Sequence, residues 1–240
     1  MIRLVQFPPA FGQPNPSPFC VKAELLLKMS GLAYENLYLA NPGKGPKGKL
    51  PAIEDEGRRI GDSELIRNYL ERRYGIDFDP GLSAEQRAIA HAFARLCEER
   101  LYWIIVHTRW MEPEHWAVLK RTFFAPLPAP LRPLIAAYLH RGMRKTLHQQ
   151  GLGRHTREEI YAFGVEDVAA LAIELAEKPF FMGEEPTAID ATVYSFLAAI
   201  AEAPFDSPVK EACLKRSNLM AYCARMSERF FPDFIMGRGA

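Results

Sequence analysis

The chain has 240 residues, enough for one large or two small domains, and its 48% hydrophobic and 25% charged residues are typical of a globular protein. Its 30 basic and 29 acidic side chains leave a net charge of +1, which gives no reason to expect a nucleic acid or an anionic membrane surface as partner. The longest apolar run, residues 191–201, is too short to cross a bilayer, and no secretory signal precedes the first predicted strand. We therefore expect a cytoplasmic protein with no membrane partner.

The four cysteines are too far apart in the sequence to form a recognisable metal or redox motif. No Cys-x-x-Cys occurs, and no His/Cys group has zinc spacing. Reduced thiols are the ordinary state of cysteines in a cytoplasmic protein. The sequence therefore predicts no structural metal and no disulfide framework. These cysteines are Cys20, Cys97, Cys213 and Cys223.

The first thirty residues predict a strand, a loop and a helix. Residues 2–7 are apolar and rich in strand formers, and residues 8–18 contain five prolines, which exclude a regular helix or strand interior. Residues 19–30 have helical spacing, with Pro18 suited to the first helical position and Ser17 to the N-cap. A helix therefore begins directly after the proline-rich loop.

The next forty-five residues predict three strands and a second helix. Residues 34–40 alternate as a strand does, and 41–49 form a loop rich in Gly, Pro and Lys. A hairpin with the turn Asp55-Glu56-Gly57 follows, and a helix starts at Asp62 or Ser63. The resulting order, β-α-β-β-β-α, favours a parallel pair for the first two strands, because a helix connects them.

Two positions in this stretch suit a binding site. Pro51 lacks an N–H and so belongs at a strand edge or start, which leaves the main-chain groups of Leu50 free to pair with an extended, peptide-like ligand. The helix start at Asp62-Ser63 offers N–H groups and a hydroxyl to a carboxylate. Local pattern alone favours the simpler interpretation, an edge strand and an ordinary helix cap.

The rest of the chain predicts a second domain made of helices. Residues 77–82 contain Asp-Pro-Gly and no periodic pattern, so we place a linker there, between domains at 1–76 and 83–240. Ser83 and Gln86 predict a capping box for a helix that continues to about residue 111, and Thr156 and Glu159 predict another. The helical segments expected in this domain are 83–111, a broken region at 110–133, 134–149, 156–177, one opening at 187–190, and a last region at 207–231.

Two motifs resemble glutathione transferases. Leu50-Pro51-Ala52-Ile53, followed by Asp62-Ser63-Glu64-Leu65-Ile66, is similar to the glutathione-binding half of that family. Gly183-x-x-Pro186-Thr187-x-x-Asp190 is similar to the start of a buried helix in its C-terminal domain, where Asp190 would have a structural role. The resemblance implies an α/β thioredoxin-like N-terminal domain plus an all-α C-terminal domain, the cytosolic glutathione transferase fold.

Within the superfamily, several short segments resemble the metaxin and failed-axon-connections-like branch. These are Ser-Pro-Phe-Cys at 17–20, Lys-Gly-Lys-Leu-Pro at 47–51, Gly-Leu-Gly-Arg-His at 151–155, and Asn-Leu-x-x-Tyr at 218–222. Activity varies among the members of this branch.

The resemblance also implies a glutathione site. The bond between Leu50 and Pro51 would be cis, with Leu50 holding the cysteinyl backbone, while Asp62 and Ser63 would hold the γ-glutamyl end. Ser17 would stabilise the thiolate, and its plainer role is helix capping. Asn15 in the same loop is a weaker candidate. Lys49 could meet the glycyl carboxylate, although a solvated loop lysine is the simpler interpretation.

The first helix of the C-terminal domain would face the cleft in such a fold. Four of its side chains could line a pocket for the electrophile, although aromatic residues at helical spacing more often belong to the core. These side chains are Tyr102, Trp103, His107 and Trp110.

We therefore expect an enzyme, a glutathione transferase that uses glutathione as co-substrate to conjugate or reduce a small hydrophobic electrophile. By resemblance it would act as a homodimer in detoxification. The main alternative is a non-catalytic binding or scaffold protein with the same fold. A thiol–disulfide reductase working through Cys20 is a third possibility, and the serine at position 17, where such proteins carry a cysteine, argues against it.

Overall fold

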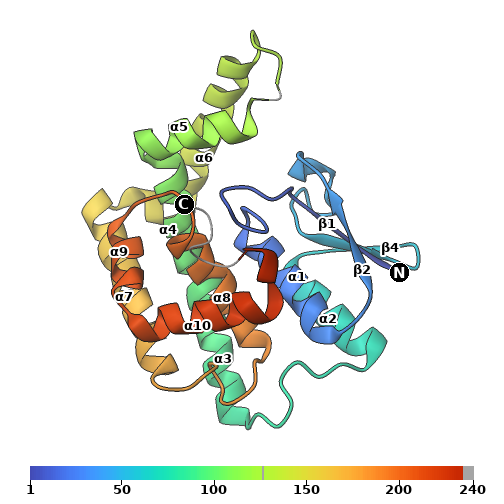
Figure 1. The fold of residues 1–240 in the computed structure, drawn as a ribbon. Helices are drawn as coiled ribbons and strands as arrows, with labels where there is room; N and C mark the ends of the chain where they lie inside the picture. The colour runs from blue at the N-terminus through green and yellow to red at the C-terminus, as the bar shows by residue number, and fades with distance from the viewer. Residues whose placement is uncertain (126, 235–240) are drawn as a thin grey trace.

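A four-stranded sheet and two helices form the N-terminal part of the computed structural model, which describes residues 1–125 and 127–234 (Figure 1). The strands are β1 (Ile2–Gln6), β2 (Tyr34–Tyr38), β3 (Ala52–Asp55) and β4 (Arg58–Gly61). Their order in the sheet is β2-β1-β3-β4, with β1 parallel to β2 and the other neighbours antiparallel. The predicted parallel pair is confirmed. Residue 126 and residues 235–240, which the predicted helical domain includes, lie outside the described residues.

The two helices of this part begin and end where the sequence places its capping residues. The helix α1 (Pro18–Ser30) follows Ser17, and α2 (Ser63–Tyr74) follows Asp62. The C-caps Gly31 and Gly75 have φ values of 69° and 68°, a conformation that glycine adopts without a steric penalty.

The β3–β4 hairpin has the turn that its sequence predicts. Glu56 and Gly57 have φ values of 47° and 78°, and two consecutive residues with positive φ are typical of a type I′ turn. The hairpin register pairs Asp55 with Arg58 and Ala52 with Gly61. This register brings the end of β4, and therefore the start of α2, back to the residues that precede β3.

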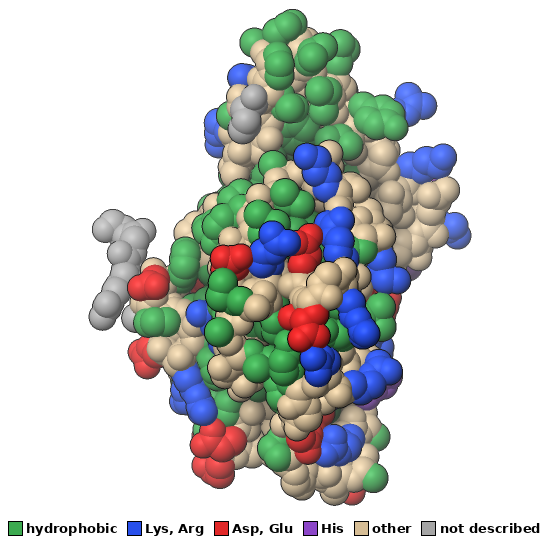
Figure 2. Space-filling view, turned by 90° about the vertical axis from the view of Figure 1, so that its right-hand side faces the viewer, with side chains coloured by type: hydrophobic (Ala, Val, Ile, Leu, Met, Phe, Trp, Pro, Cys, Tyr) green, Lys and Arg blue, Asp and Glu red, His purple; other side chains and the backbone are tan. Residues whose placement is uncertain are grey.

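The rest of the described chain is helical. One long helix, predicted for 83–111, consists of α3 (Ala84–Arg95), a π-helical segment (Leu96–Leu101) and α4 (Tyr102–Met111). The region 110–133, predicted to be broken, contains the regular helix α5 (Pro113–Phe123), and the break lies between it and α6 (Arg132–Gln150). Together α5 and α6 project from the body of the molecule (Figures 1 and 2).

Four further helices complete the domain. They are α7 (Arg157–Leu175), α8 (Ala188–Ala201), α9 (Pro208–Leu214) and α10 (Ser217–Phe230), and the last two occupy the helical region predicted at 207–231. The predicted thioredoxin-like domain followed by a helical domain is confirmed. The predicted boundary at residues 77–82 covers the connection between α2 and α3. None of the helices in residues 1–125 and 127–234 has the length and apolar character that a bilayer-spanning helix needs.

Helix α8 is the centre of the helical domain. All of its residues are buried, as expected for a helix that is apolar on every side. At its start the Asp190 carboxylate accepts hydrogen bonds from the N–H groups of Phe181 at 2.9 Å and Thr187 at 2.8 Å. The predicted structural role of Asp190 is therefore what the geometry shows. Helix α1 packs against α8, with the rings of Phe19 and Phe196 in edge contact at 5.4 Å.

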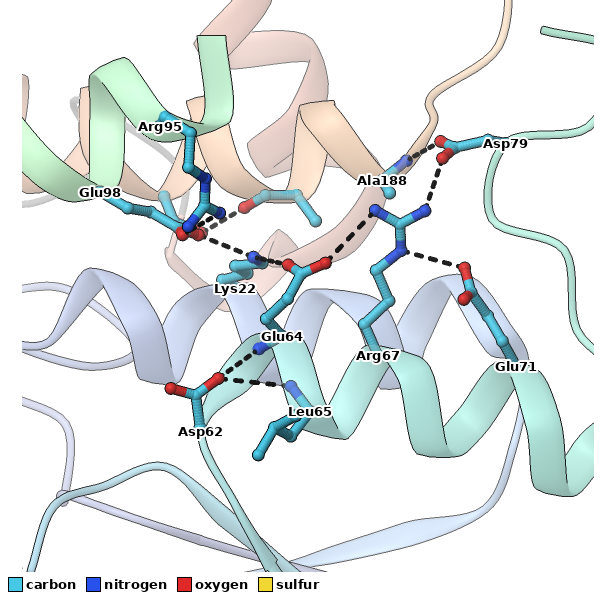
Figure 3. Close-up of polar contacts among 12 residues, drawn as sticks. Lys22, Asp62, Glu64, Leu65, Arg67, Glu71, Asp79, Arg95, Glu98 and Ala188 are labelled. Atoms are coloured by element: carbon cyan, nitrogen blue, oxygen red, sulfur yellow. Dashed lines mark hydrogen bonds and ion pairs between the residues drawn. The ribbon is translucent and has the colours of Figure 1, made fainter. Parts of the chain in front are cut away.

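A buried lysine connects the two domains beside this packing. Lys22 of α1, only 1% exposed, donates hydrogen bonds to Glu98 at 2.7 Å and to Glu64 at 2.9 Å (Figure 3). Glu98 lies in the π-helical segment, and Glu64 is the second residue of α2. Arg95 forms a second ion pair with Glu98 at 2.5 Å. Lys22 therefore fixes both the start of α2 and the first helix of the helical domain relative to α1.

Replacing Lys22 with methionine should lower the free energy of unfolding by about 3 kcal/mol, because Glu98 stays buried after losing one of its cations. Urea denaturation measures this loss. Adding Glu98→Met to Lys22→Met should recover part of it, since both buried charges are then absent.

The matched control is Lys215→Met, which breaks a 2.5 Å ion pair with Glu211 whose side chains are mostly exposed. We expect this variant to unfold almost as the unmodified protein does. Equal losses for Lys22→Met and Lys215→Met would show that the interdomain pair contributes no more than a surface pair.

Candidate functional site

Three segments that are separate in the sequence meet at one edge of the sheet. The peptide bond between Leu50 and Pro51 is cis, as the resemblance implies. Leu50 lies in one buried cluster with Cys20 of α1, and the Pro51 carbonyl accepts a hydrogen bond from the Asp62 N–H at 3.1 Å. The starts of α1 and α2 and the loop before β3 are thereby brought together.

Ser17 lies at the N-terminus of α1 with its hydroxyl unused for capping. Its backbone has the extended conformation of an N-cap residue, but its side chain makes no capping hydrogen bond. The side chain is partly exposed. The first N–H groups of a helix favour an anion close to them. The partly exposed Ser17 side chain thus lies at the N-terminus of α1 without a capping role.

The backbone of this loop is fixed from the sheet side by Asn15. This side chain is 1% exposed, accepts a hydrogen bond from the Ser17 N–H at 3.0 Å, and donates to the Phe7 carbonyl at 2.6 Å. It also donates to Gln6 at 3.0 Å, and Gln6 donates to the Glu24 carboxylate at 2.8 Å. Asn15, the weaker of the two loop candidates, is thus buried, and its side chain fixes the backbone of Ser17.

The same loop is fixed from the helical domain by Arg109 of α4, a residue to which the sequence analysis gave no role. Its guanidinium donates to the Pro16 carbonyl at 2.5 Å and to the Ala199 carbonyl of α8 at 2.9 Å. It also lies over the Phe205 ring, 5.3 Å from the centroid. The one sequence signal was a lone arginine within an otherwise apolar helix face.

Arg109 is buried without a carboxylate partner among the described residues. Burial lowers the pKa of its guanidinium to about 10, with the nearby Tyr102 opposing the change. The side chain therefore remains a cation at neutral pH. A buried cation without a counterion is costly, and an anion bound beside the loop would reduce that cost.

The start of α2 places a carboxylate oxygen and a backbone N–H group close together. One oxygen of the Asp62 carboxylate accepts from the N–H groups of Glu64 at 3.0 Å and Leu65 at 3.3 Å (Figure 3). Its other oxygen makes no hydrogen bond to a described residue, and the N–H of Ser63, as the first of the helix, has no intrahelical partner. An ammonium group and a carboxylate could each find a partner here.

Asp62 also has an unusual backbone conformation. Its φ of 89° lies in the region that favours glycine, and such residues are often found at functional sites. Ser63, which follows it, is 4% exposed. Lys49, the third candidate on this side, is exposed in the 41–49 loop, one residue before Leu50.

The four side chains predicted to line the electrophile pocket lie on different sides of α4. Tyr102 is in edge contact with Phe19 of α1 at 4.9 Å and with Trp103 at 5.1 Å. His107 faces Tyr161 of α7, and Trp110 stacks on Trp116 of α5 at 5.3 Å.

Of these four residues, Tyr102 thus contacts the start of α1, and Trp103 contacts Tyr102. Burial lowers the pKa of His107, so that its ring is mainly uncharged at neutral pH. The assignment of these four residues to a substrate pocket stays a prediction.

The thiol of Cys20 is not suited to nucleophilic chemistry. It is fully buried, and burial raises its pKa to about 12, although the Ser17 hydroxyl and the Phe7 backbone oppose the change. The other three cysteines are buried as well. In the described residues, no group of three or more His, Cys, Asp or Glu side chains is positioned to hold a metal ion.

Two family models match the chain. The glutathione S-transferase N-terminal domain matches residues 18–115, and the glutathione S-transferase C-terminal domain matches residues 164–226. The isoprene-epoxide–glutathione S-transferase of Rhodococcus sp. is 34% identical over 96% of this chain and 99% of its own length. The chain belongs to the glutathione transferase superfamily.

Other members of the superfamily place it near a particular branch. Failed axon connections of Drosophila melanogaster is 32% identical over 98% of this chain, and metaxin-1 of Sus scrofa is 32% identical over 81%. The chain spans 59% and 64% of the lengths of these two relatives. The resemblance to the metaxin-like branch is confirmed.

Solved glutathione transferases have the same fold. One from Ceriporiopsis subvermispora, in complex with glutathione, has a TM-score of 0.54 and 17% identity, with 100% of this chain and 99% of that chain covered.

The position of Ser17 can be tested with a cysteine. In a Ser17→Cys variant the new thiol is partly exposed at a helix N-terminus, which lowers a thiol pKa. We expect iodoacetamide at neutral pH to modify this position at least ~10-fold faster than Cys20. A phosphine reductant keeps the two thiols of the resulting Cys-x-x-Cys segment from pairing. Tandem mass spectrometry of the peptide that contains both positions then gives both rates in one sample.

The unmodified protein serves as the control, and its four buried cysteines should stay unmodified while the protein is folded. If position 17 in the Ser17→Cys variant reacted as slowly as Cys20, the start of α1 would not be an accessible anion site.

Proposed function

We propose that this chain binds glutathione at the meeting point of α1, the 50–51 loop and α2, and that it transfers the glutathionyl sulfur to a hydrophobic electrophile. The observation that carries the proposal is the convergence of three short segments, joined by the Asp62 N–H bond to Pro51 and the contact of Leu50 with Cys20. Each segment offers a different kind of group to a tripeptide.

In this proposal the free main-chain groups of Leu50 pair with the cysteinyl part of glutathione, as a sheet edge pairs with an added strand. The N–H and hydroxyl of Ser63 bind the γ-glutamyl carboxylate at the start of α2. The unused oxygen of Asp62 binds the adjacent ammonium. Lys49, an exposed cation next to Leu50 in the sequence, meets the glycyl carboxylate.

The chemical step needs a thiolate. Ser17 donates a hydrogen bond to the glutathione sulfur, and the N-terminus of α1 with the buried Arg109 cation favours its negative charge. The thiol proton leaves to solvent. The sulfur electron pair then forms a carbon–sulfur bond, while the electrons of the broken bond pass to the epoxide oxygen or the leaving group of the electrophile.

The relatives of this chain point to two different candidate functions. The name of the Rhodococcus protein, matched over nearly its whole length, describes a transferase for isoprene epoxide, which is a small hydrophobic electrophile. The names of metaxin-1 and failed axon connections describe no reaction, and similarity to them keeps open the second candidate, a binding or scaffold protein with the same fold. A buried Cys20 thiol with a raised pKa argues against a thiol–disulfide reductase.

The resemblance supplies three further parts of the proposal. We propose that the chain acts in the cytoplasm, that it forms a homodimer, and that it contributes to detoxification. Tyr102 would form the wall of the electrophile pocket nearest Ser17, since its ring lies against Phe19 of α1, and Trp103 would continue that wall beside it.

Calorimetric titration with reduced glutathione tests the proposal. We expect saturable binding that Ser63→Ala weakens at least ~10-fold, because the γ-glutamyl carboxylate loses a hydrogen bond. Ser17→Ala should keep most of the binding and lower the rate of conjugation. Ser83→Ala is the control, since it removes a serine hydroxyl from the start of a different helix, α3.

Two outcomes would contradict the proposal. One is the absence of heat from binding at millimolar glutathione. The other is equal binding by the Ser63→Ala and Ser83→Ala variants. Binding without any conjugation of epoxides or halogenated aromatics would favour the scaffold candidate instead.

A further inference from the structure

Helices α5 and α6 project from the helical domain, and we call residues 113–125 and 127–150 the α5–α6 arm (Figure 1). The base of the arm is held by the stacked rings of Trp116 and Trp110 and by a hydrogen bond of 2.9 Å between His140 Nε2 and the Trp110 carbonyl. The arm lies largely between the regions matched by the two family models. The end of α5 also touches the body, since the Phe123 ring is in edge contact with Phe11 at 5.5 Å. The arm is therefore a supported projection.

The outer part of the arm exposes apolar side chains. Leu134 is 69% exposed and Tyr138 is 77% exposed, and hydrophobic side chains gather at the top of Figure 2. Five of the twelve large hydrophobic side chains that are exposed among the described residues belong to this arm: Phe123, Leu131, Leu134, Tyr138 and Leu139. Clustered apolar exposure on a protein surface marks an interaction site.

The arm also carries most of the positive charge excess of the chain. Residues 113–150 contain six basic side chains and one acidic side chain, a net charge of +5, while the remaining residues contain 24 and 28, a net charge of −4. The near-zero charge of the whole chain hides this separation. The six cations are Lys120, Arg121, Arg132, Arg141, Arg144 and Lys145.

These cations are available to a partner of opposite charge. None of them forms an ion pair with an acidic residue in the described part of the chain. Arg132 binds the carbonyl oxygens of Ala125 at 2.7 Å and Leu127 at 3.0 Å and so helps to close the turn at the tip.

The apolar and basic residues follow one another along α6. At 1.5 Å per residue, Arg141 lies ~10 Å and Lys145 ~16 Å behind Leu134. Peripheral helices bury their apolar side chains ~5–10 Å into the boundary between headgroups and acyl chains. With the tip at that depth, these cations reach the level of the lipid phosphates, and Tyr138 lies at the interface that aromatic residues prefer.

We propose that the α5–α6 arm docks on a membrane surface of anionic phospholipid, with its apolar tip inserted and its cations on the phosphates. The tip is a narrow convex end, whereas protein interfaces of standard size bury ~800 Å² on each partner. Two arms of net charge +5 would also repel each other, so arm-to-arm pairing of two copies is disfavoured.

Co-sedimentation of the whole protein with vesicles tests the proposal. The vesicles contain phosphatidylcholine alone or phosphatidylcholine mixed with phosphatidylglycerol, at ~0.05 M and ~0.5 M salt. We expect binding to the anionic vesicles only, with most of it lost at high salt. Each cation near an anionic surface contributes a factor of ~5, so Arg141→Gln with Arg144→Gln and Lys145→Gln should weaken binding more than ~10-fold.

A second variant tests the apolar tip separately. Leu134→Ser with Tyr138→Ser should also abolish most binding, whereas Ile173→Ser, which removes a 78% exposed apolar side chain from α7, should not. Glutathione titration and thermal unfolding of every variant show whether the body remains intact.

The proposal is wrong if the unmodified protein binds no anionic vesicles at low salt, or binds uncharged vesicles equally well. It is also wrong if the arm variants change the molar mass in light scattering and leave vesicle binding unaltered, because the tip would then be covered by a second copy of the chain.

Discussion

The guanidinium of Arg109 joins the two domains at the loop that ends in Ser17. It donates to the carbonyl oxygens of Pro16 and Ala199, and no described carboxylate balances its charge. A buried cation without a counterion costs free energy, and here the two carbonyl hydrogen bonds offset part of that cost. The loop therefore cannot move away from α4 without leaving this charge with fewer hydrogen bonds. An anion bound beside the loop would interact favourably with the same charge.

The sheet holds the loop from the other side. Asn15 accepts the Ser17 N–H and is itself bound to Gln6 of β1, which contacts Glu24 of α1. A five-proline loop has few regular backbone hydrogen bonds of its own, so these side chains supply the constraint that secondary structure would otherwise give. Ser17, the 50–51 loop and the start of α2 are consequently held in one arrangement before any ligand binds, and such preorganisation favours binding.

The sequence predicts those features of the structure that depend on residues close together in the chain, such as helix caps and turns. The caps at Ser83, Thr156 and Thr187, the hairpin turn at Asp55-Glu56-Gly57 and the helix start at Asp62-Ser63 are short patterns, and the structure contains each of them. The contact between Arg109 and Pro16 spans 93 positions, and that between Lys22 and Glu98 spans 76, so no local pattern indicates either. Similarly, the sequence predicts that Tyr102 and His107 belong to one helix. It does not predict the packing that places His107 against Tyr161 of α7.

The central claim is that the Ser17 loop and the charge behind it stabilise a thiolate, and the pKa of enzyme-bound glutathione measures this directly. Thiolate absorbance in the ultraviolet, followed against pH, should give a bound pKa well below the value of ~8.5 for a free thiol. Arg109→Met should raise that bound pKa by about one unit, and Arg109→Lys, which keeps the charge, should raise it less. A bound pKa equal to that of a free thiol in the unmodified protein would contradict the account. So would the same bound pKa in the unmodified protein, Arg109→Met and Arg109→Lys.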